Sequence, residues 1–155
     1  MSYIMALSIP TAVLCGVWSL ITPSLGLIGW AGFAGCTTYF ASGSHGIEGA
    51  KTTLFTNLSG VFWAMMIIIL SNKFHFLGSA AVFTGIITFI MCIQSKIKYF
   101  SFIPGTFLGC FSTFAGNGNW KMVALSLLLG AFLGIACEWS GNITYSKFGA
   151  DKEDS

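Results

Sequence analysis

Six apolar segments, separated by short polar connections, constrain what this chain can fold into more than any other feature. Each is close to the roughly 20 apolar residues that a helix needs to cross a bilayer. Because lipid cannot satisfy backbone polar groups, such segments are expected to be helical or enclosed by protein. The sequence therefore predicts an all-α integral membrane protein, a single transmembrane domain over residues 1–155. Its six predicted spans are Ile4–Ile21, Leu25–Ala41, Thr52–Leu70, Phe76–Gln94, Phe100–Ala115 and Met122–Trp139.

Charged residues are too sparse for a surface that faces water. They make up 8% of the chain, against about 25% in a soluble globular domain. The net charge of +2 and the lack of any basic run exclude a nucleic-acid partner. No zinc spacing, glycine-rich phosphate loop or carboxylate pair indicates an enzyme, a metal centre or a cofactor. The expected partners are the lipid bilayer and a small solute.

The lysines predict the orientation of the chain. With six spans both termini lie on one side, and that side receives five lysines, whereas the other receives Lys73 and Lys121. Cytoplasmic loops carry an excess of Lys and Arg. Both termini are therefore predicted to be cytoplasmic, together with a tail over residues 141–155 that ends in the charged segment Asp151–Ser155.

An internal repeat relates the two halves of the sequence. Phe, Gly, Cys, Phe and Ala recur in register between Phe33–Ala41 and Phe107–Ala115. A polar loop ending in Lys follows each segment, and a Gly comes nine residues after each of these lysines, at Gly60 and Gly130. Because three spans per repeat is an odd number, the halves must face opposite ways across the membrane. The sequence predicts a 3+3 inverted-topology repeat, with halves at about 4–71 and 76–140; chance similarity between apolar segments is the alternative.

Paired positions near the middle of spans two and five are the candidate functional residues. Cys36 and Cys110 recur between the halves, and Phe33 and Phe107 lie one turn away on the same faces. If a pathway runs between these spans, the four side chains form its narrowest part. The alternative is that they fill a packed core. Hydroxyl and amide groups complete the predicted pathway lining: Thr37, Ser112, Thr113 and Asn57.

No charged residue lies in the middle of any predicted span. Glu138, in the last turn of span six, is the nearest case. The helix dipole disfavours an anion there, so Lys96 or Lys98 is the expected partner of this carboxylate. His45 and His75 are interpreted as loop residues rather than ligands.

All five cysteines fall inside apolar runs and are interpreted as small buried residues. A soft-metal site at Cys36 and Cys110 is an alternative, because thiolates suit Cu(I). Small residues also recur at helical spacing, as at Ser126, Gly130 and Gly134. Such faces let helices approach closely, within one protomer or between protomers, and we expect a homo-oligomer.

The same regions carry a resemblance to a known family. The matching stretches include Gly29–Phe33, Gly35–Thr37, Pro104–Phe107 and Thr113–Gly116. In these stretches, and over most of its length, the chain resembles a bacterial inner-membrane family known only as domain of unknown function 1097. The resemblance implies a bacterial cytoplasmic membrane and implies no activity.

The uncharged, weakly polar centre favours a passive channel or facilitator for a small uncharged or weakly acidic solute. A secondary transporter is the first alternative, and it would need a coupling site to which Glu138, Asn57 or Gln94 contributes. A structural or regulatory membrane subunit without a pathway is the second.

Overall fold

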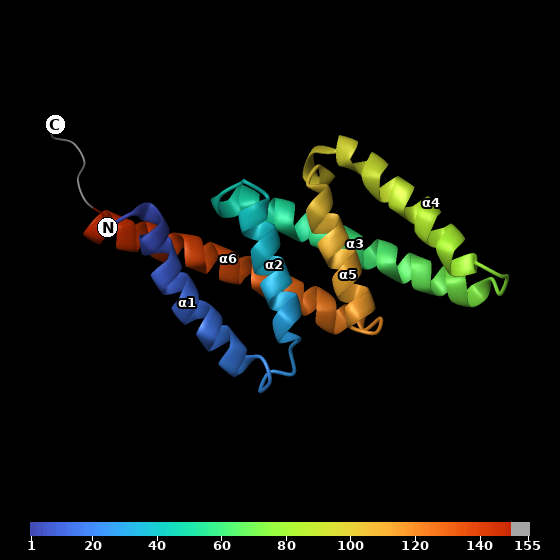
Figure 1. Cartoon of the computed structure of the whole chain (residues 1–155), viewed down its shortest axis with the longest axis horizontal. Coiled ribbons are helices and arrows are strands. Elements are labelled where there is room, and N and C mark those ends of the chain that lie inside the picture. Colours follow the sequence, from blue (N-terminus) through green and yellow to red (C-terminus); the bar gives the residue numbers. More distant parts are fainter. Residues whose placement is uncertain (150–155) are drawn as a thin grey trace.

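The computed structural model describes residues 1–149, and that part of the chain is helical without any strand. Figure 1 shows the helices spread along one long axis, with α2 crossing α6 and α5 crossing α3 in a flattened layer. The predicted all-α class is confirmed. The six α-helices are α1 (Tyr3–Ile21), α2 (Gly29–Ala41), α3 (Gly46–Lys73), α4 (Ser79–Ile93), α5 (Ile103–Ala115) and α6 (Trp120–Phe148), with two short 3-10 turns, η1 (Gln94–Lys96) and η2 (Lys98–Phe100), between α4 and α5.

The other four helices pack against the two long helices, α3 and α6. The short helix α2 packs against α6, and the short helix α5 packs against α3 (Figure 1). On the outside, α1 lies on α6 and α4 lies on α3. The first-half helices α1 and α2 therefore pack on the long helix of the second half, and α4 and α5 pack on that of the first.

Glycines in α2 and α5 bring these pairs into direct backbone contact. A Cβ at Gly35 of α2 would collide with the carbonyl oxygen of Leu127 in α6. A Cβ at Gly109 of α5 would collide with the carbonyl oxygen of Asn57 in α3. Neither position tolerates a side chain without moving a helix backbone, so both crossings depend on glycine.

The long helices contribute glycines of their own to the same two crossings. A Cβ at Gly130 of α6 would meet the carbonyl of Gly32 in α2, and one at Gly60 of α3 would meet the carbonyl of Thr106 in α5. The two contacts correspond residue for residue under the register of the sequence repeat. The predicted role of the small residues in close helix packing is confirmed for these positions.

Only four of the six helices are long and apolar enough to span a membrane by length and composition: α1, α3, α6 and α4 extended through η1. The helices α2 and α5 have 13 residues each, which is roughly 20 Å at 1.5 Å per residue. The predicted spans Leu25–Ala41 and Phe100–Ala115 therefore begin too early. Residues 25–28 and residues 101–102 are not helical, and they form short lead-ins to α2 and α5. Six continuous spanning helices are not confirmed.

The lead-in to α2 does not leave its backbone unsatisfied. The amide of Ile28 donates to the hydroxyl of Ser126 in α6 over 2.9 Å. Trp18 of α1 donates its indole N–H to the carbonyl of Gly29 over 3.0 Å. Irregular backbone at membrane depth is tolerated where protein supplies such partners, so the lead-in is compatible with a position inside the bilayer.

Two predicted boundaries at the C-terminal end need correction or fall outside the described residues. Residues 141–148 were expected in a tail, but they continue α6 to Phe148. There Tyr3 of α1 donates a hydrogen bond to Asn142, and the rings of Tyr3 and Tyr145 meet edge to face. Helical packing on α1 thus extends the last helix. The predicted charged end Asp151–Ser155 lies outside the described residues.

Large apolar side chains cover the outer faces. Leu20 of α1, Phe89 of α4 and Phe132 of α6 are all more than half exposed. Contiguous apolar surface on this scale is not stable against water. The outer faces are therefore those that a lipid bilayer covers.

Candidate functional site

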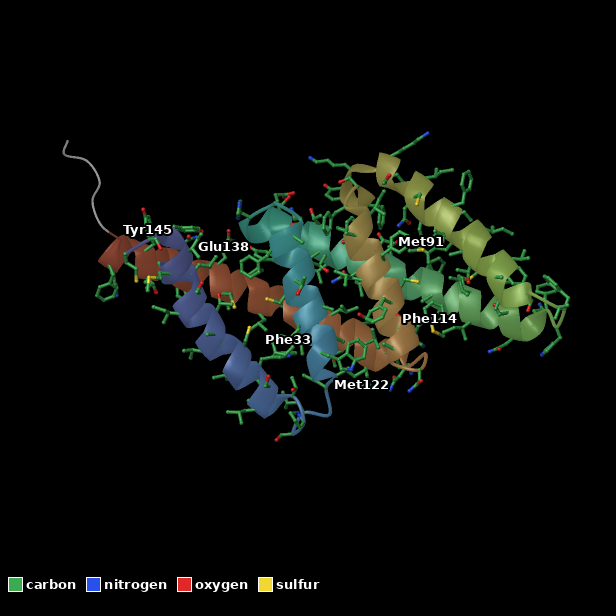
Figure 2. The ribbon with its side chains drawn as sticks, in the orientation of Figure 1. Phe33, Met91, Phe114, Met122, Glu138 and Tyr145 are labelled. Atoms are coloured by element: carbon green, nitrogen blue, oxygen red, sulfur yellow. The ribbon has the colours of Figure 1, made fainter. Side chains whose placement is uncertain are left out.

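A groove of about 520 Å³ lies between α1 and α2. These two helices barely touch, since each packs on α6 instead. Figure 2 shows Phe33 in the space between them. The groove contains aromatic, thiol and hydroxyl groups and no charge. Its lining residues are Thr11, Cys15, Phe33, Cys36, Thr37, Phe40 and Ala41.

Three cysteines meet beside this groove. Cys36 of α2 and Cys137 of α6 belong to one buried cluster with Trp18, and Cys15 of α1 packs against it. The thiols make this wall of the groove weakly polar, and the cysteine side chains are small compared with the ring of Phe33.

Three of the eight predicted pathway residues line this groove. Phe33 is half-buried, Cys36 is buried and Thr37 is exposed. They come together as expected for one helix face, but that face points toward α1 rather than toward α5.

The structure does not bring their second-half counterparts to the same place. Cys110 is buried against Ile67, Ile87 and Met91, in a cluster of α3, α4 and α5 residues. Phe107 is 42% exposed on the surface. Each cysteine faces the outer helix of its own half, so the four predicted residues form two separate groups rather than one constriction.

The alternative of a soft-metal site at Cys36 and Cys110 does not fit this arrangement, because the two cysteines belong to different clusters. Within residues 1–149, no three His, Cys, Asp or Glu side chains come together to hold a metal ion.

The remaining three predicted residues are buried where the halves meet. Asn57 of α3 accepts a hydrogen bond from the hydroxyl of Thr38 in α2 over 2.9 Å. The hydroxyl of Thr113 in α5 donates to the carbonyl of Gly109, one turn earlier in the same helix. The hydroxyl of Ser112 and the side-chain nitrogen of Asn57 find no partner among the described residues. These groups form a polar seam inside the protein.

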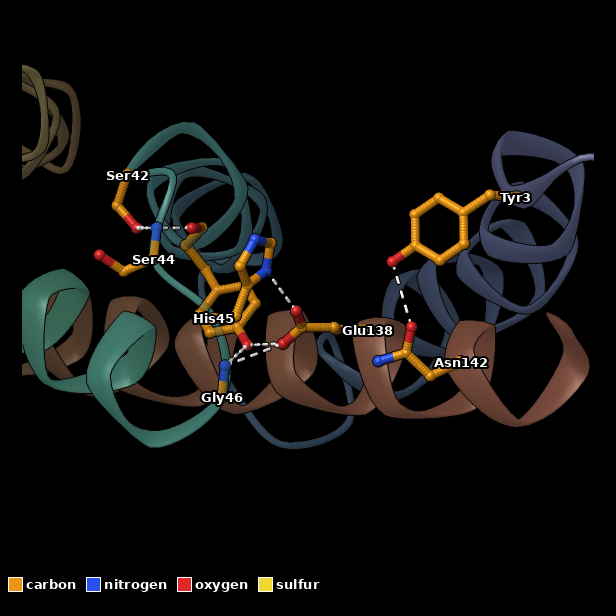
Figure 3. Close-up of polar contacts among 8 residues, drawn as sticks. Tyr3, Ser42, Ser44, His45, Gly46, Glu138 and Asn142 are labelled. Carbon is orange, nitrogen blue, oxygen red and sulfur yellow. Dashed lines mark hydrogen bonds and ion pairs between the residues drawn. The ribbon is translucent and has the colours of Figure 1, made fainter. Parts of the chain in front are cut away.

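Glu138 of α6 is the centre of a polar cluster at the end of α2 (Figure 3). One carboxylate oxygen accepts from the hydroxyl of Tyr39 and, over 3.0 Å, from the amide of Gly46. The other lies 2.5 Å from Nδ1 of His45. The expected partner, Lys96 or Lys98, is therefore wrong, because the partners come from the end of α2, the α2–α3 connection and the start of α3. His45 does lie in that connection, as expected, but it also pairs with this carboxylate.

A second polar cluster fixes the end of α4. The side-chain oxygen of Gln94 accepts from the hydroxyl of Ser59 over 3.0 Å and from the indole of Trp63 over 2.8 Å. Its nitrogen donates to Thr106 of α5 over 3.3 Å. Gln94 thereby ties α4 to both α3 and α5, through its side-chain oxygen and nitrogen respectively.

Sequence reasoning missed the groove and the donors around Glu138. Cys15 and Thr11 carried no signal, because α1 has no clear counterpart in the repeat. Glu138 did carry one, since an acidic residue near the end of an apolar span needs a partner. Its partners come from residues about 90–100 positions away, and spacing along one helix says nothing about them.

Comparisons with known proteins agree with the membrane character of this fold. A family model described as "Protein of unknown function (DUF1097)" matches residues 8–142. The "Inner membrane protein YcdZ" of Escherichia coli (strain K12) is 47% identical over 144 residues, covering 91% of this chain and 87% of that protein. Its namesake in Salmonella typhimurium is 45% identical over 142 residues, covering 91% and 89%.

A more distant relative is the "Uncharacterized protein YahC" of Escherichia coli (strain K12). It is 28% identical over 153 residues, covering 91% of this chain and 92% of that protein. No solved structure matches the chain.

Proposed function

The chain belongs to the DUF1097 family of proteins of unknown function, and from this premise we propose that it is a passive facilitator for a small uncharged or weakly acidic solute. Relatives are named inner membrane proteins, so the proposed location is a bacterial inner membrane. The path we assign is the groove between α1 and α2.

The uncharged lining of the groove is the observation that carries this proposal. Phe33 and Phe40 narrow it, and Thr11 and Thr37 offer hydroxyls. A hydrated ion would lose its water there without charged or carbonyl ligands in return, which is costly. A small neutral solute loses much less, and hydroxyls and thiols replace part of its hydration.

The groove is open along one side, so a second copy of the chain is proposed to close it. Thr37 is exposed in the groove, and Phe40 beside it is 39% exposed. A polar path that opened directly to lipid would leave its solute facing hydrocarbon, where polar groups find no partners. A homo-oligomer that covers this side makes an enclosed path.

An inverted 3+3 repeat is part of the proposal. Its support is the correspondence of the helix crossings: Gly35 on Leu127 matches Gly109 on Asn57 under the register of the sequence repeat. In Figure 1 the α1–α2, α3–α4 and α5–α6 connections lie along one edge of the layer, and the α2–α3 and α4–α5 connections lie along the other. With their lead-ins, α2 and α5 complete the crossing, and the lysine bias places both termini in the cytoplasm.

Solute flux into proteoliposomes tests the function. The purified protein is expected to pass water, urea, glycerol or a short-chain acid faster than protein-free liposomes do. Thr37→Trp, which fills the groove from an exposed position, is expected to lower this flux. Phe111→Trp is the matched control, because Phe111 occupies the corresponding position of the second half and is also exposed. If none of these solutes passes faster than in protein-free liposomes, the function is that of a subunit without a path.

A secondary transporter is the second candidate, and the Glu138 cluster favours it. A carboxylate paired with a histidine can take up and release a proton. Accumulation of solute against its gradient when a pH gradient is imposed would identify this function, because a passive facilitator only equalises concentrations.

A further inference from the structure

Glu138 fastens three separate parts of the chain together. It lies in α6, Tyr39 lies in the last turn of α2, and Gly46 begins α3. The amide of Gly46 donates to the hydroxyl of Tyr39 over 2.8 Å as well as to the carboxylate. The connection between α2 and α3 is therefore held down onto α6 through one carboxylate (Figure 3).

This fastening lies at the end of the proposed path. Phe40 and Ala41, which line the groove, are the last residues of α2. The connection continues from them directly, and Ser42 turns it by donating to the carbonyl of Tyr39 over 2.8 Å. Gly43 and Gly46 have φ values of +67° and +57°, conformations that other residues rarely adopt. The α2–α3 connection therefore begins where the lining of the groove ends.

The second half of the chain does without such a fastening. Under the repeat, the position of Glu138 corresponds to Ile68 of α3. The α5–α6 connection, residues 116–119, is as long as the α2–α3 connection, residues 42–45, but it has no histidine. The fold of one half therefore does not require the cluster. Because only the α2–α3 connection has it, the cluster indicates a role beyond packing.

His45 brings an imidazole to the cluster, the side chain that proteins commonly use as a switch near neutral pH. Its side chain is 79% exposed, whereas that of Glu138 is 11% exposed. The other titratable groups facing this region are Tyr39 from α2, Tyr3 from α1, which bonds to Asn142, and Cys137 from α6. At the start of α3, Glu48 and Lys51 pair with each other at 2.9 Å.

We propose that Glu138 and His45 form a proton-binding site that controls how firmly the α2–α3 connection closes the end of the groove. The proposal rests on the function proposed above, because the groove is taken to be the solute path. Protonated His45 forms an ion pair with the carboxylate, and this attraction between opposite charges adds to the hydrogen bond that a neutral imidazole would donate. Acid therefore tightens the connection, and rising pH loosens it as His45 loses its proton.

The test is flux of a solute that does not ionise, such as urea or glycerol, at equal pH inside and outside proteoliposomes. We expect wild-type flux to rise roughly fivefold between about pH 5.5 and about pH 8, the range in which imidazole side chains commonly act as switches. His45→Gln keeps a neutral donor and is expected to show high flux at every pH. His45→Lys keeps a permanent positive charge and is expected to show low flux at every pH.

His75→Gln is the matched control, since His75 is exposed in the α3–α4 connection on the opposite edge of the layer. Its pH dependence is expected to equal that of the wild type. Solute flux above that of protein-free liposomes that does not change with pH in the wild type would overturn the proton site and leave the proposed function standing.

Hydrogen exchange separates the site from the function. If no solute passes at any pH, the function fails, but protection of the Gly46 amide still reports on the connection. With the intrinsic pH dependence of exchange removed, protection should fall with rising pH in the wild type and stay constant in His45→Lys. Equal pH dependence in both proteins would refute the proton site.

Discussion

Gly60 of α3 faces Gly109 of α5 so closely that a Cβ added to Gly60 would stand 2.9 Å from the Cα of Gly109. The same Cβ would also collide with the carbonyl of Thr106. Both neighbours are backbone, so no side-chain rotation relieves the clash. This contact and its counterpart between α6 and α2 hold the short helices on the long ones.

Gly60→Ala and Gly130→Ala are therefore expected to lower stability in detergent. Overpacking a tight core typically costs about 1–3 kcal/mol, and here the helix backbones must separate. Thermal unfolding followed by circular dichroism measures the loss. Gly85→Ala is the control, because nothing lies within 4 Å of a Cβ at Gly85 of α4. A Gly60→Ala protein as stable as Gly85→Ala would show that the crossing relaxes without cost.

These contacts also show how far the sequence alone reaches. The register of the repeat aligned Gly35 with Gly109 and Gly60 with Gly130, and all four lie at helix crossings. Six helices were also predicted, because apolar runs and helical spacing are local signals. The number of full spans was not predictable, because hydropathy does not separate the helix Gly29–Ala41 from its non-helical lead-in.

The candidate site was predictable only in part. Helical periodicity places Phe33 and Cys36 on one face, but it does not say which neighbouring helix that face meets. That information lies in the packing of α1 on α6, for which the sequence repeat gave no guide. The pair of Glu138 and His45 depends on two elements 93 positions apart, which no spacing rule connects.

The polar seam gives a prediction about Asn57. Its side-chain nitrogen has no partner among the described residues, while its oxygen accepts from Thr38. The register of the repeat aligns Asn57 with Leu127, so a leucine suits this kind of crossing. Asn57→Leu is expected to unfold at or above the wild-type temperature, because a buried unsatisfied group costs about 1–3 kcal/mol.

Thr38→Val provides the contrast, since it leaves the oxygen of Asn57 unpaired and should destabilise by about 1–3 kcal/mol. Flux measured on Asn57→Leu should equal that of the wild type, because Asn57 lies away from the groove. A loss of flux without a loss of stability in Asn57→Leu would show that Asn57 lines the solute path, as the sequence alone predicts.

Orientation can be tested with two exposed positions on opposite edges of the layer. Leu77 lies in the α3–α4 connection and Lys98 in the α4–α5 connection. With both termini in the cytoplasm, Leu77→Cys should react with a membrane-impermeant maleimide in intact cells, and Lys98→Cys only after permeabilisation. The unsubstituted protein measures the background from native cysteines. The reverse pattern would invert the topology.

The open side of the groove gives a prediction about assembly. A single chain has a mass of 16.6 kDa, and the detergent-solubilised wild type is expected to show a multiple of it by light scattering. Thr37→Trp places a bulky group on the face that a second copy is proposed to cover and should shift the population toward monomer. A wild type that is monomeric in mild detergent and after crosslinking in membranes would leave the groove open to lipid and remove the proposed closure.

The two repeated phenylalanines decide where the path runs. Phe33 lies in the groove between α1 and α2, whereas Phe107 lies exposed on α5 in the other half. Phe33→Ala removes a large ring from the narrow part of the groove, so solute flux in proteoliposomes is expected to rise and discrimination between urea and glycerol to weaken. Phe107→Ala removes the same ring from a surface that meets lipid or a neighbouring copy, and flux is expected to stay at the wild-type level.

The two substitutions remove the same group from matching positions of the repeat. A difference in flux between them therefore depends on where the ring lies and not on which group is removed. If Phe107→Ala raises flux as much as Phe33→Ala, the path runs between the halves and the groove between α1 and α2 is not the route.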